Sequence, residues 1–179
     1  MIITKRHLQL FKPERLILES ERLNYLWPTK EERESKGATI FLSHKHEEIE
    51  ILRQVVSLLK SLGTTIYLDW LDEDMPTETS GKTAERLKNK IIENQKFILL
   101  ATEAAIASKW CNWELGYGDA KKFHKHIAVM PIAENDGKWS GNEYLQIYPI
   151  IKNNYENLPF GYYVEYKDNA ISFEDWLKS

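Results

Sequence analysis

Short apolar segments that alternate with amphipathic segments are the feature of this sequence that most limits its possible folds. Phe97 to Ala101 (FILLA) is apolar throughout, which is typical of a strand buried on both faces. Amphipathic helices are expected over 49–62 and from about Gly81, because apolar residues recur there at helical spacing. Further strands are expected at 39–43, 65–68 and 127–132. This alternation predicts a parallel sheet with right-handed crossovers.

The charged N-terminal region differs from the rest of the chain. Residues 1–36 are interrupted at Pro13 and Pro28, and leucines at helical spacing predict a short helix near 14–26. We interpret 1–36 as a partly helical N-terminal extension and 37–179 as one folded domain.

The C-terminal part of that domain has a weaker pattern. Residues 134–160 lack periodicity and are expected to form loops with short helical turns. Residues 161–166 (GYYVEY) are expected to form a last strand, and Ser172 and Asp175 are placed as the cap of a C-terminal helix.

Composition excludes several classes of function. The net charge is −3 with acids and bases interspersed, so no basic surface for nucleic acid is expected. No segment approaches the roughly 18 apolar residues of a membrane span, and no signal-peptide core is found. The single cysteine, Cys111, cannot form an internal disulfide, which fits a reducing compartment. We therefore expect a cytoplasmic protein that binds neither nucleic acid nor membrane.

The segment SKWCNWELGY, residues 108–117, contains an unusual carboxylate. On a helix, Glu114 lies on the same side as three aromatic residues, and it has no basic residue three or four positions away. Placing a carboxylate against aromatic rings costs folding free energy, so a residue of this kind is a candidate for a functional role. Taken alone, the pattern still favours a structural role, in which Glu114 reaches water or pairs with a distant base. The three aromatic residues are Trp110, Trp113 and Tyr117.

Polar residues follow the predicted strands at the edge of the sheet where ligands of such folds bind. The first strand ends at Ser43 and continues into His44 and Lys45, and the second ends at Asp69. The helix with Glu114 follows the third strand, so these side chains are expected to meet in one cleft. A solvated loop explains His44 and Lys45 equally well, and a turn explains Asp69 equally well.

Several familiar motifs are missing. The sequence has no GxxxxGK[ST] phosphate loop and no GxSxG nucleophile elbow, and Gly116-Tyr117-Gly118 is not a dinucleotide fingerprint. The pairs His44/His46 and His124/His126 have a spacing that can chelate a metal. With one cysteine and no convergent carboxylates, however, the sequence predicts no metal site.

Three segments, in the right order, resemble the Toll/interleukin-1 receptor (TIR) domain family. Phe41 to His44 (FLSH) resembles its first-strand signature, and Leu68-Asp69 with the following loop resembles its second strand and BB loop. Residues 108–114 (SKWCNWE) resemble its third-helix motif, including the Trp-x-x-x-Glu spacing. The resemblance covers about 38–134. It implies a flavodoxin-like α/β fold, a three-layer sandwich whose central parallel sheet has the order 2-1-3-4-5 and helices on both faces.

This resemblance implies a function. Many bacterial and plant TIR domains, and one animal axonal one, cleave NAD⁺ between nicotinamide and ribose, and some cyclise the product. In these enzymes the third-helix glutamate is catalytic, and it falls here on Glu114. His44 and Lys45 match positions that line the nucleotide site, and the further substrate-binding candidates are Ser43, Asp69 and Trp110. We therefore expect a bacterial-type, NADase-like enzyme of defence or stress signalling, with NAD⁺ as substrate and no cofactor or metal.

The proposed chemistry suits a carboxylate. Nicotinamide leaves as a neutral group and positive charge develops on the ribose, as in glycoside hydrolysis. A carboxylate in a poorly hydrated site can stabilise that charge. Trp110 either stacks on nicotinamide or ribose, or supports the helix. Whether water or the adenine nitrogen captures the cation stays open.

Alternatives remain at this level. Animal receptor and adaptor TIR domains are mostly interaction modules, so a non-catalytic TIR–TIR signalling module is the main alternative, and a nucleoside deoxyribosyltransferase-like enzyme is the third. The resemblance also implies self-association. The second-strand loop is acidic, with Asp72, Glu73 and Asp74 and no basic residue near Pro76. It therefore suits the basic surface of a neighbouring protomer better than a pyrophosphate.

Overall fold

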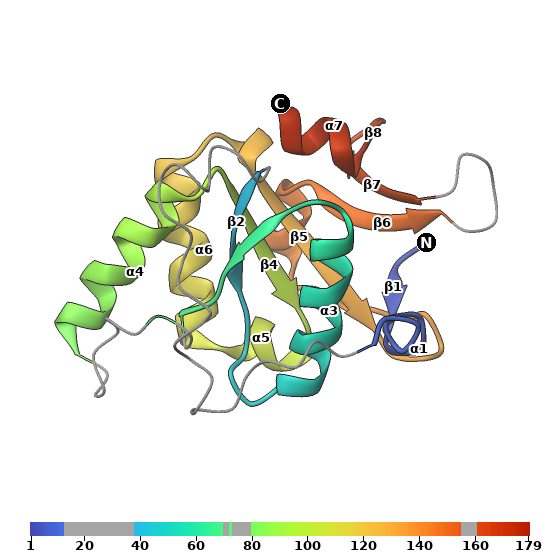
Figure 1. The fold of residues 1–179 in the computed structure, drawn as a ribbon, viewed down its shortest axis with the longest axis horizontal. Helices are drawn as coiled ribbons and strands as arrows, with labels where there is room; N and C mark the ends of the chain where they lie inside the picture. The colour runs from blue at the N-terminus through green and yellow to red at the C-terminus, as the bar shows by residue number, and fades with distance from the viewer. Residues whose placement is uncertain (13–37, 70–71, 73–79, 155–160) are drawn as a thin grey trace.

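The strands form one sheet in which five neighbouring strands run parallel. The computed structural model describes residues 1–12, 38–69, 72, 80–154 and 161–179, and these form a sheet with helices on both faces (Figure 1). The sheet has the order β3-β2-β4-β5-β6-β7-β8, and β1 pairs with β5 beside this path. The five parallel strands are β2 (Thr39–Ser43), β3 (Thr65–Tyr67), β4 (Lys96–Ala101), β5 (Ile127–Ala133) and β6 (Ile150–Asn154), and β3 lies at one edge of the sheet. Numbered along the chain, these five have the order 2-1-3-4-5, so the predicted α/β fold is confirmed.

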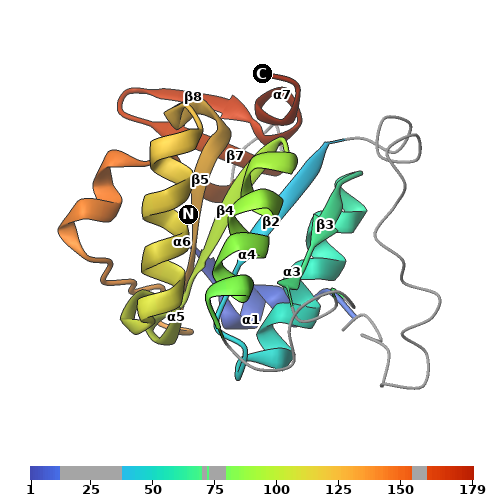
Figure 2. The ribbon, with the colours of Figure 1, turned by 90° about the vertical axis from the view of Figure 1, so that its left-hand side faces the viewer.

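Alternation along the strands divides the core into two layers. Ile40 and Leu42 of β2 pack with α3 (Ile49–Ser61) on one face of the sheet. Phe41 of β2 packs on the other face, where the core includes residues of α4 (Gly81–Glu93), α5 (Glu103–Ala107) and α6 (Lys109–Lys121). Figure 2 shows α4 and α6 in front of this face. The second face therefore carries the helix with the carboxylate singled out above.

The helix ends follow the local signals in the sequence. After α3, Gly63 adopts a φ of +78° and its N–H donates to the carbonyl of Lys60, which ends the helix with a glycine in the left-handed region. The C-terminal helix α7 (Phe173–Lys178) begins after Ser172, whose hydroxyl accepts from the backbone N–H of Asp175. The predicted cap at Ser172 is confirmed.

The segment from 134 to 166 differs in part from the expectation. It contains a short helical turn, η4 (Glu143–Ile147), as predicted, but also the strand β6, where only loops and turns were expected. The predicted last strand is present as β7 (Gly161–Tyr166), which runs antiparallel to β6 and pairs with β8 (Asn169–Ser172). The fifth parallel strand is therefore β6, and the hairpin β7–β8 extends the sheet beyond it.

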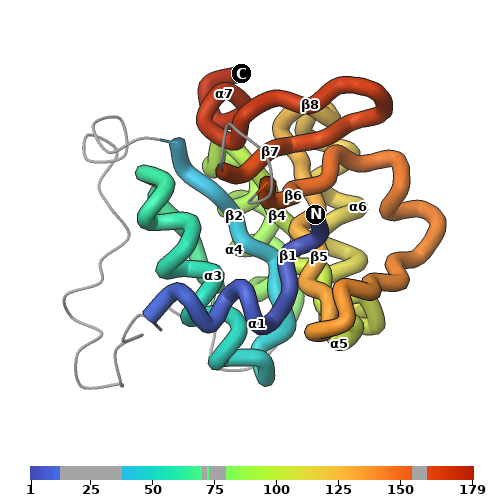
Figure 3. The backbone as a smooth tube through the Cα atoms, turned by 90° about the vertical axis from the view of Figure 1, so that its right-hand side faces the viewer, coloured from blue at the N-terminus to red at the C-terminus, as the bar shows by residue number. Residues whose placement is uncertain are grey.

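The first residues of the chain lie against the same sheet. β1 (Ile3–Thr4) runs parallel to the end of β5, with Ile3 opposite Ile132, and α1 (Lys5–Leu8) follows it (Figure 3). The predicted helix near 14–26 lies outside the described residues, and the division of the chain at residue 36 stays a prediction. Among the described residues, no helix has both the length and the apolar character needed to cross a membrane.

Candidate active site

Glu114 lies buried between α6 and the end of β2. Strand alternation places Ser43 on the same face of the sheet as Phe41, which is the face that α6 covers. The Ser43 hydroxyl donates a hydrogen bond of 2.5 Å to Oε2 of Glu114, and Glu114 is only 5% exposed. Ser43 was predicted to bind substrate, but in this arrangement it holds the carboxylate.

The buried side of α6 explains how the carboxylate comes so close to the sheet. Glu114 belongs to a buried stripe with Cys111, Leu115 and Gly118. A Cβ atom at Gly118 would lie 3.3 Å from Cδ2 of the Phe97 ring on β4, so glycine allows α6 to approach that strand closely.

The aromatic residues of α6 lie beside the buried stripe that contains Glu114, and none of the three is fully buried. Trp110 is 40% exposed, and it packs edge-to-face on Trp113. Trp113 stacks on Tyr117, and the Lys88 ammonium group of α4 lies within 6 Å of both ring centroids. Helical periodicity indicates which residues share a side, but it does not indicate which side faces the sheet. Of these three rings only Trp110 lines the site described below.

Burial strongly affects the ionisation of Glu114. Loss of solvent, followed by the nearby negative charge of Asp69, raises the pKa of Glu114 to about 8. The hydrogen bond from Ser43 and the charge of His46 act in the opposite direction and lower the pKa. At neutral pH the carboxyl is therefore mostly protonated, and a positive charge brought beside it would favour ionisation.

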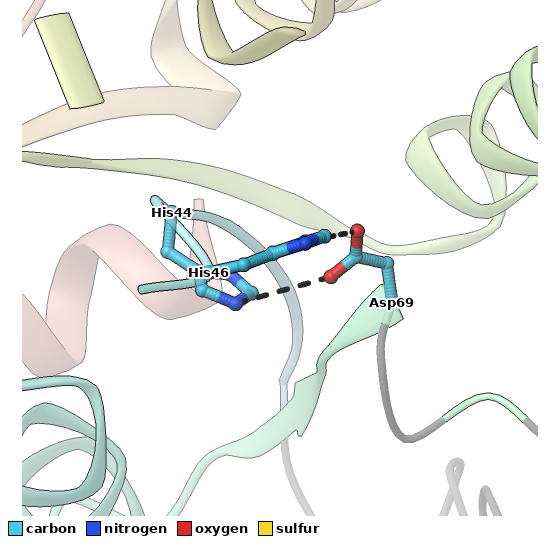
Figure 4. A group of neighbouring side chains, drawn as sticks. All are labelled: His44, His46 and Asp69. Atoms are coloured by element: carbon cyan, nitrogen blue, oxygen red, sulfur yellow. Dashed lines mark hydrogen bonds and ion pairs between the residues drawn. The ribbon is translucent and has the colours of Figure 1, made fainter. Parts of the chain in front are cut away.

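His44 and His46 both face Asp69 at the edge of the sheet (Figure 4). His46 Nε2 lies 2.8 Å from Oδ2 of Asp69, whereas His44 Nε2 lies 3.9 Å from Oδ1. The bond to Asp69 raises the pKa of the exposed His46, so this imidazole is charged over a wider pH range. Burial lowers the pKa of His44, which favours its neutral form.

These groups surround a pocket of about 160 Å³. Five of the six predicted site residues line it: His44, Lys45, Asp69, Trp110 and Glu114. The sixth, Ser43, lies behind Glu114 as described. Sequence reasoning did not assign the other lining residues, which are His46, Glu47, Thr83, Leu87 and Ser108. The alternation of His44 and His46 was the one signal that could have identified His46.

Two further residues have structural roles. Cys111 is buried, its thiol donates to the carbonyl of His44 at 3.3 Å, and burial raises its pKa, so it packs as a small apolar residue. In the acidic loop, Asp72 accepts two hydrogen bonds from Arg86, at 2.6 and 2.8 Å, and one from the Tyr67 hydroxyl. Asp72 is therefore engaged within the chain, while Glu73, Asp74 and Pro76 lie outside the described residues.

The chain is similar in sequence to one protein family and to two proteins named as cyclic ADP-D-ribose synthases. A family model described as "TIR domain" matches residues 40–154. ThsB′ of Bacillus cereus (strain MSX-D12), named as a probable 3′ cyclic ADP-D-ribose synthase, is 28% identical over 139 residues, which are 75% of this chain and 67% of that protein. TIR2 of Cytobacillus dafuensis, provisionally named a cyclic ADP-D-ribose synthase, is 26% identical over 81 residues, 44% of this chain and 21% of that protein. The residues that the family model matches include the tip of β2, Asp69 and α6.

Proposed function

The chain belongs to the TIR domain family, and we propose that it is an enzyme which consumes NAD⁺ by breaking the bond between nicotinamide and ribose. The observation that supports this most is the position of Glu114, a buried carboxylate that is hydrogen-bonded by Ser43 and lines a pocket with His44 and Trp110. The names of both relatives support an activity of this type.

Glu114 is proposed to stabilise the positive charge that develops on the ribose. When the bond breaks, its electron pair leaves with the nicotinamide nitrogen, and the cation remains on the sugar. A carboxylate in a poorly hydrated site stabilises such a cation more strongly than it would in water. Because nicotinamide leaves as a neutral molecule, the step needs no general acid and no organic cofactor.

The raised pKa of Glu114 fits a cationic substrate. The nicotinamide ring of NAD⁺ carries a positive charge, and a cation near the carboxyl favours its ionised form. Substrate binding is therefore expected to release a proton from Glu114, so that the carboxylate is charged when the ribosyl cation forms. The positive charge of His46 is directed toward Asp69, with which it is hydrogen-bonded.

The other pocket residues suit the binding of substrate. Trp110 offers an exposed ring beside Glu114 on which nicotinamide or ribose can stack. Lys45, whose ammonium group lies 3.1 Å from the Glu47 carboxylate, is proposed to turn toward the phosphates of the substrate. Asp69 and His44 also line the pocket and are proposed to contact the ribose.

Cyclisation is the outcome that we propose for the sugar cation. Capture by water gives ADP-ribose, whereas capture by a nucleophile in the adenosine part of the same molecule gives a cyclic product. Each outcome releases one proton. Both relatives are named for the second outcome. The isomer of the product depends on how the adenosine part is held.

Self-association is proposed as a condition for activity. A pocket of about 160 Å³ is smaller than the roughly 300–1,000 Å³ of sites for drug-sized ligands, and NAD⁺ is larger than most of these. The pocket can accept one end of the dinucleotide, so other residues must hold the rest. If a second copy supplies them, turnover per chain will increase with protein concentration.

The test is incubation of purified protein with NAD⁺ over a range of protein concentrations, with products identified by mass. Glu114→Gln should lower turnover at least 100-fold, comparable to the loss of a principal electrostatic stabiliser. Glu47→Gln is the matched control, because it neutralises an exposed carboxylate of the same pocket and should change turnover only a few-fold.

Two results would redirect the assignment. Unchanged turnover in Glu114→Gln would refute the role of this residue. Absence of NAD⁺ turnover in the wild type at every concentration would favour the non-catalytic interaction module. A panel of deoxynucleosides in the same assay separates the deoxyribosyltransferase-like alternative.

A further inference from the structure

Three side chains at the edge of the sheet present potential ligand atoms to one point. His44 and His46 follow β2, and Asp69 follows β3, the neighbouring strand. One ligand atom from each lies within 4.8 Å of the other two, and both imidazole rings turn toward the Asp69 carboxylate (Figure 4). In the part of the chain that the structure describes, this is the one group of three or more such residues.

The hydrogen bond of His44 identifies which of its nitrogens carries the proton. Nδ1 lies 2.9 Å from the carbonyl oxygen of Leu42, which can only accept, so Nδ1 is the donor. In the neutral ring, Nε2 therefore carries a lone pair. A ring nitrogen that donates to a backbone carbonyl while the other stays free to bind is the usual arrangement of a metal-ligating histidine.

The free nitrogen of His44 is buried and unsatisfied. The side chain is 2% exposed, and Nε2 has no hydrogen-bond partner among the described residues. It points instead at Oδ1 of Asp69, 3.9 Å away, so that a lone pair faces a carboxylate. A buried acceptor without a donor is costly, and a cation bound by this nitrogen would satisfy it.

The distances suit a small ion after slight adjustment. Zinc binds histidine nitrogen and carboxylate oxygen at about 2.0–2.2 Å, so ligand atoms around a tetrahedral ion lie about 3.3 Å apart. His46 Nε2 lies 2.8 Å from Oδ2 of Asp69, and His44 Nε2 lies 3.9 Å from Oδ1, so the two separations lie on either side of this value. His46, whose side chain is 59% exposed, can turn without disturbing the core, and it gives up its ring proton when it binds.

We propose that His44, His46 and Asp69 bind a divalent transition-metal ion of the zinc type. Two imidazole nitrogens and one carboxylate favour such an ion over Mg²⁺ or Ca²⁺, which prefer oxygen ligands. Three protein ligands leave a fourth position for water, as in open zinc sites. The ion would also offset the charge of Asp69 that acts on Glu114, so metal loading is coupled to the candidate active site.

This cluster of three ligands could not be predicted from the spacing of the residues in the sequence. The two histidines are separated by one residue, but the carboxylate lies 23 residues after His46 and joins them only because β2 and β3 are neighbours. The second histidine pair, His124 and His126, lies on the short helix η3 (His124–His126) and does not form a cluster of three with any described residue.

The experiment measures metal binding alone, without NAD⁺, so its result is independent of the proposed enzymatic activity. Tag-free protein is stripped with a chelator, desalted and titrated with Zn²⁺ by calorimetry and with Co²⁺ by visible absorption. We expect one ion per chain and the intense absorption of four-coordinate Co²⁺. His46→Ala and Asp69→Asn should each weaken binding at least ~100-fold, since loss of an outer-shell partner alone costs 10–100-fold.

The control is His124→Ala. This histidine also pairs with a carboxylate, with Nε2 3.2 Å from Oδ1 of Asp119, and it is partly exposed like His46. Its variant should bind the ion as the wild type does. The proposal is overturned if wild type and His46→Ala, both shown to be folded by circular dichroism, bind Zn²⁺ equally, or if Mg²⁺ binds as tightly as Zn²⁺. The proposal is also overturned if His124→Ala weakens Zn²⁺ binding as much as His46→Ala does.

Discussion

Glu114→Gln should make the protein more stable while it removes the proposed catalytic carboxylate. Glutamine keeps the size of the side chain and an acceptor for the Ser43 hydroxyl, but it cannot ionise. In the wild type, the folded state holds the Glu114 proton up to about pH 8, whereas the unfolded state releases it near 4.5. The folded state therefore binds more protons between these values, and the wild type loses stability as pH rises through this range.

The size of this effect follows from the two pKa values. At about 1.4 kcal/mol per pH unit, the difference between 4.5 and 8 accumulates to about 5 kcal/mol above pH 8 and about 3 kcal/mol at pH 7. The variant should exceed the wild type in free energy of unfolding by these amounts, and the two should converge near pH 4.5.

Urea unfolding of both proteins from pH 5 to 9 measures this difference, with a chelator present so that no bound cation alters the pKa of Glu114. Subtraction at each pH removes the titration of all other groups. Glu47→Gln serves as control, because its exposed carboxylate should give no difference that grows between pH 5 and 8. A difference between wild type and Glu114→Gln that stays constant with pH would refute the reasoning.

Three further outcomes are expected. If ionised Glu114 is the active form, kcat/KM for NAD⁺ should rise about tenfold per pH unit up to pH 8 and level off above it; initial rates from pH 6 to 9 check this, and a flat profile contradicts it. Ser43→Ala removes a hydrogen bond to the ionised form of Glu114, so the pKa of Glu114 should rise. In the same assay, kcat/KM at pH 7 should fall about tenfold, and the pH at which kcat/KM levels off should increase. Arg86→Ala takes two hydrogen bonds from the buried carboxylate of Asp72 and should lower the free energy of unfolding in urea by about 2–3 kcal/mol, with partial recovery in Arg86→Lys, which lacks the two-pronged geometry.

The strands that bury every residue were predictable from the sequence. Of the partly exposed strands, β3 and β7 were predicted but β6 was not. β4 and β5 are buried along their whole length, and such apolar segments have few alternatives in a folded chain. β6 was missed because its buried residues are Ile151 and Asn153, and a buried asparagine gives no apolar signal. The backbone N–H of Asn153 donates to the carbonyl of Met1, a partner that no local pattern indicates.

The candidate site was predictable as far as topology determines it. Because parallel strands end at one edge, the tips of β2 and β3 and the start of α6 had to meet, which brought His44, Asp69 and Glu114 together. The contacts within the site depend on atomic detail. The bond from Ser43 to Glu114 requires α6 to lie close to the sheet, and this closeness depends on the missing side chain of Gly118.

The hairpin β7–β8 also has a consequence for how the protein behaves at high concentration. Its strand β7 pairs with β6, whose backbone N–H and C=O groups would otherwise be unpaired at the edge of the sheet and available to other chains. The edge strand that replaces β6 has four residues, mostly exposed, and the opposite edge, β3, has three. Short edges offer few hydrogen bonds to an incoming strand, so the sheet is protected against edge-to-edge aggregation, and a chain cut before Gly161 would lose that protection.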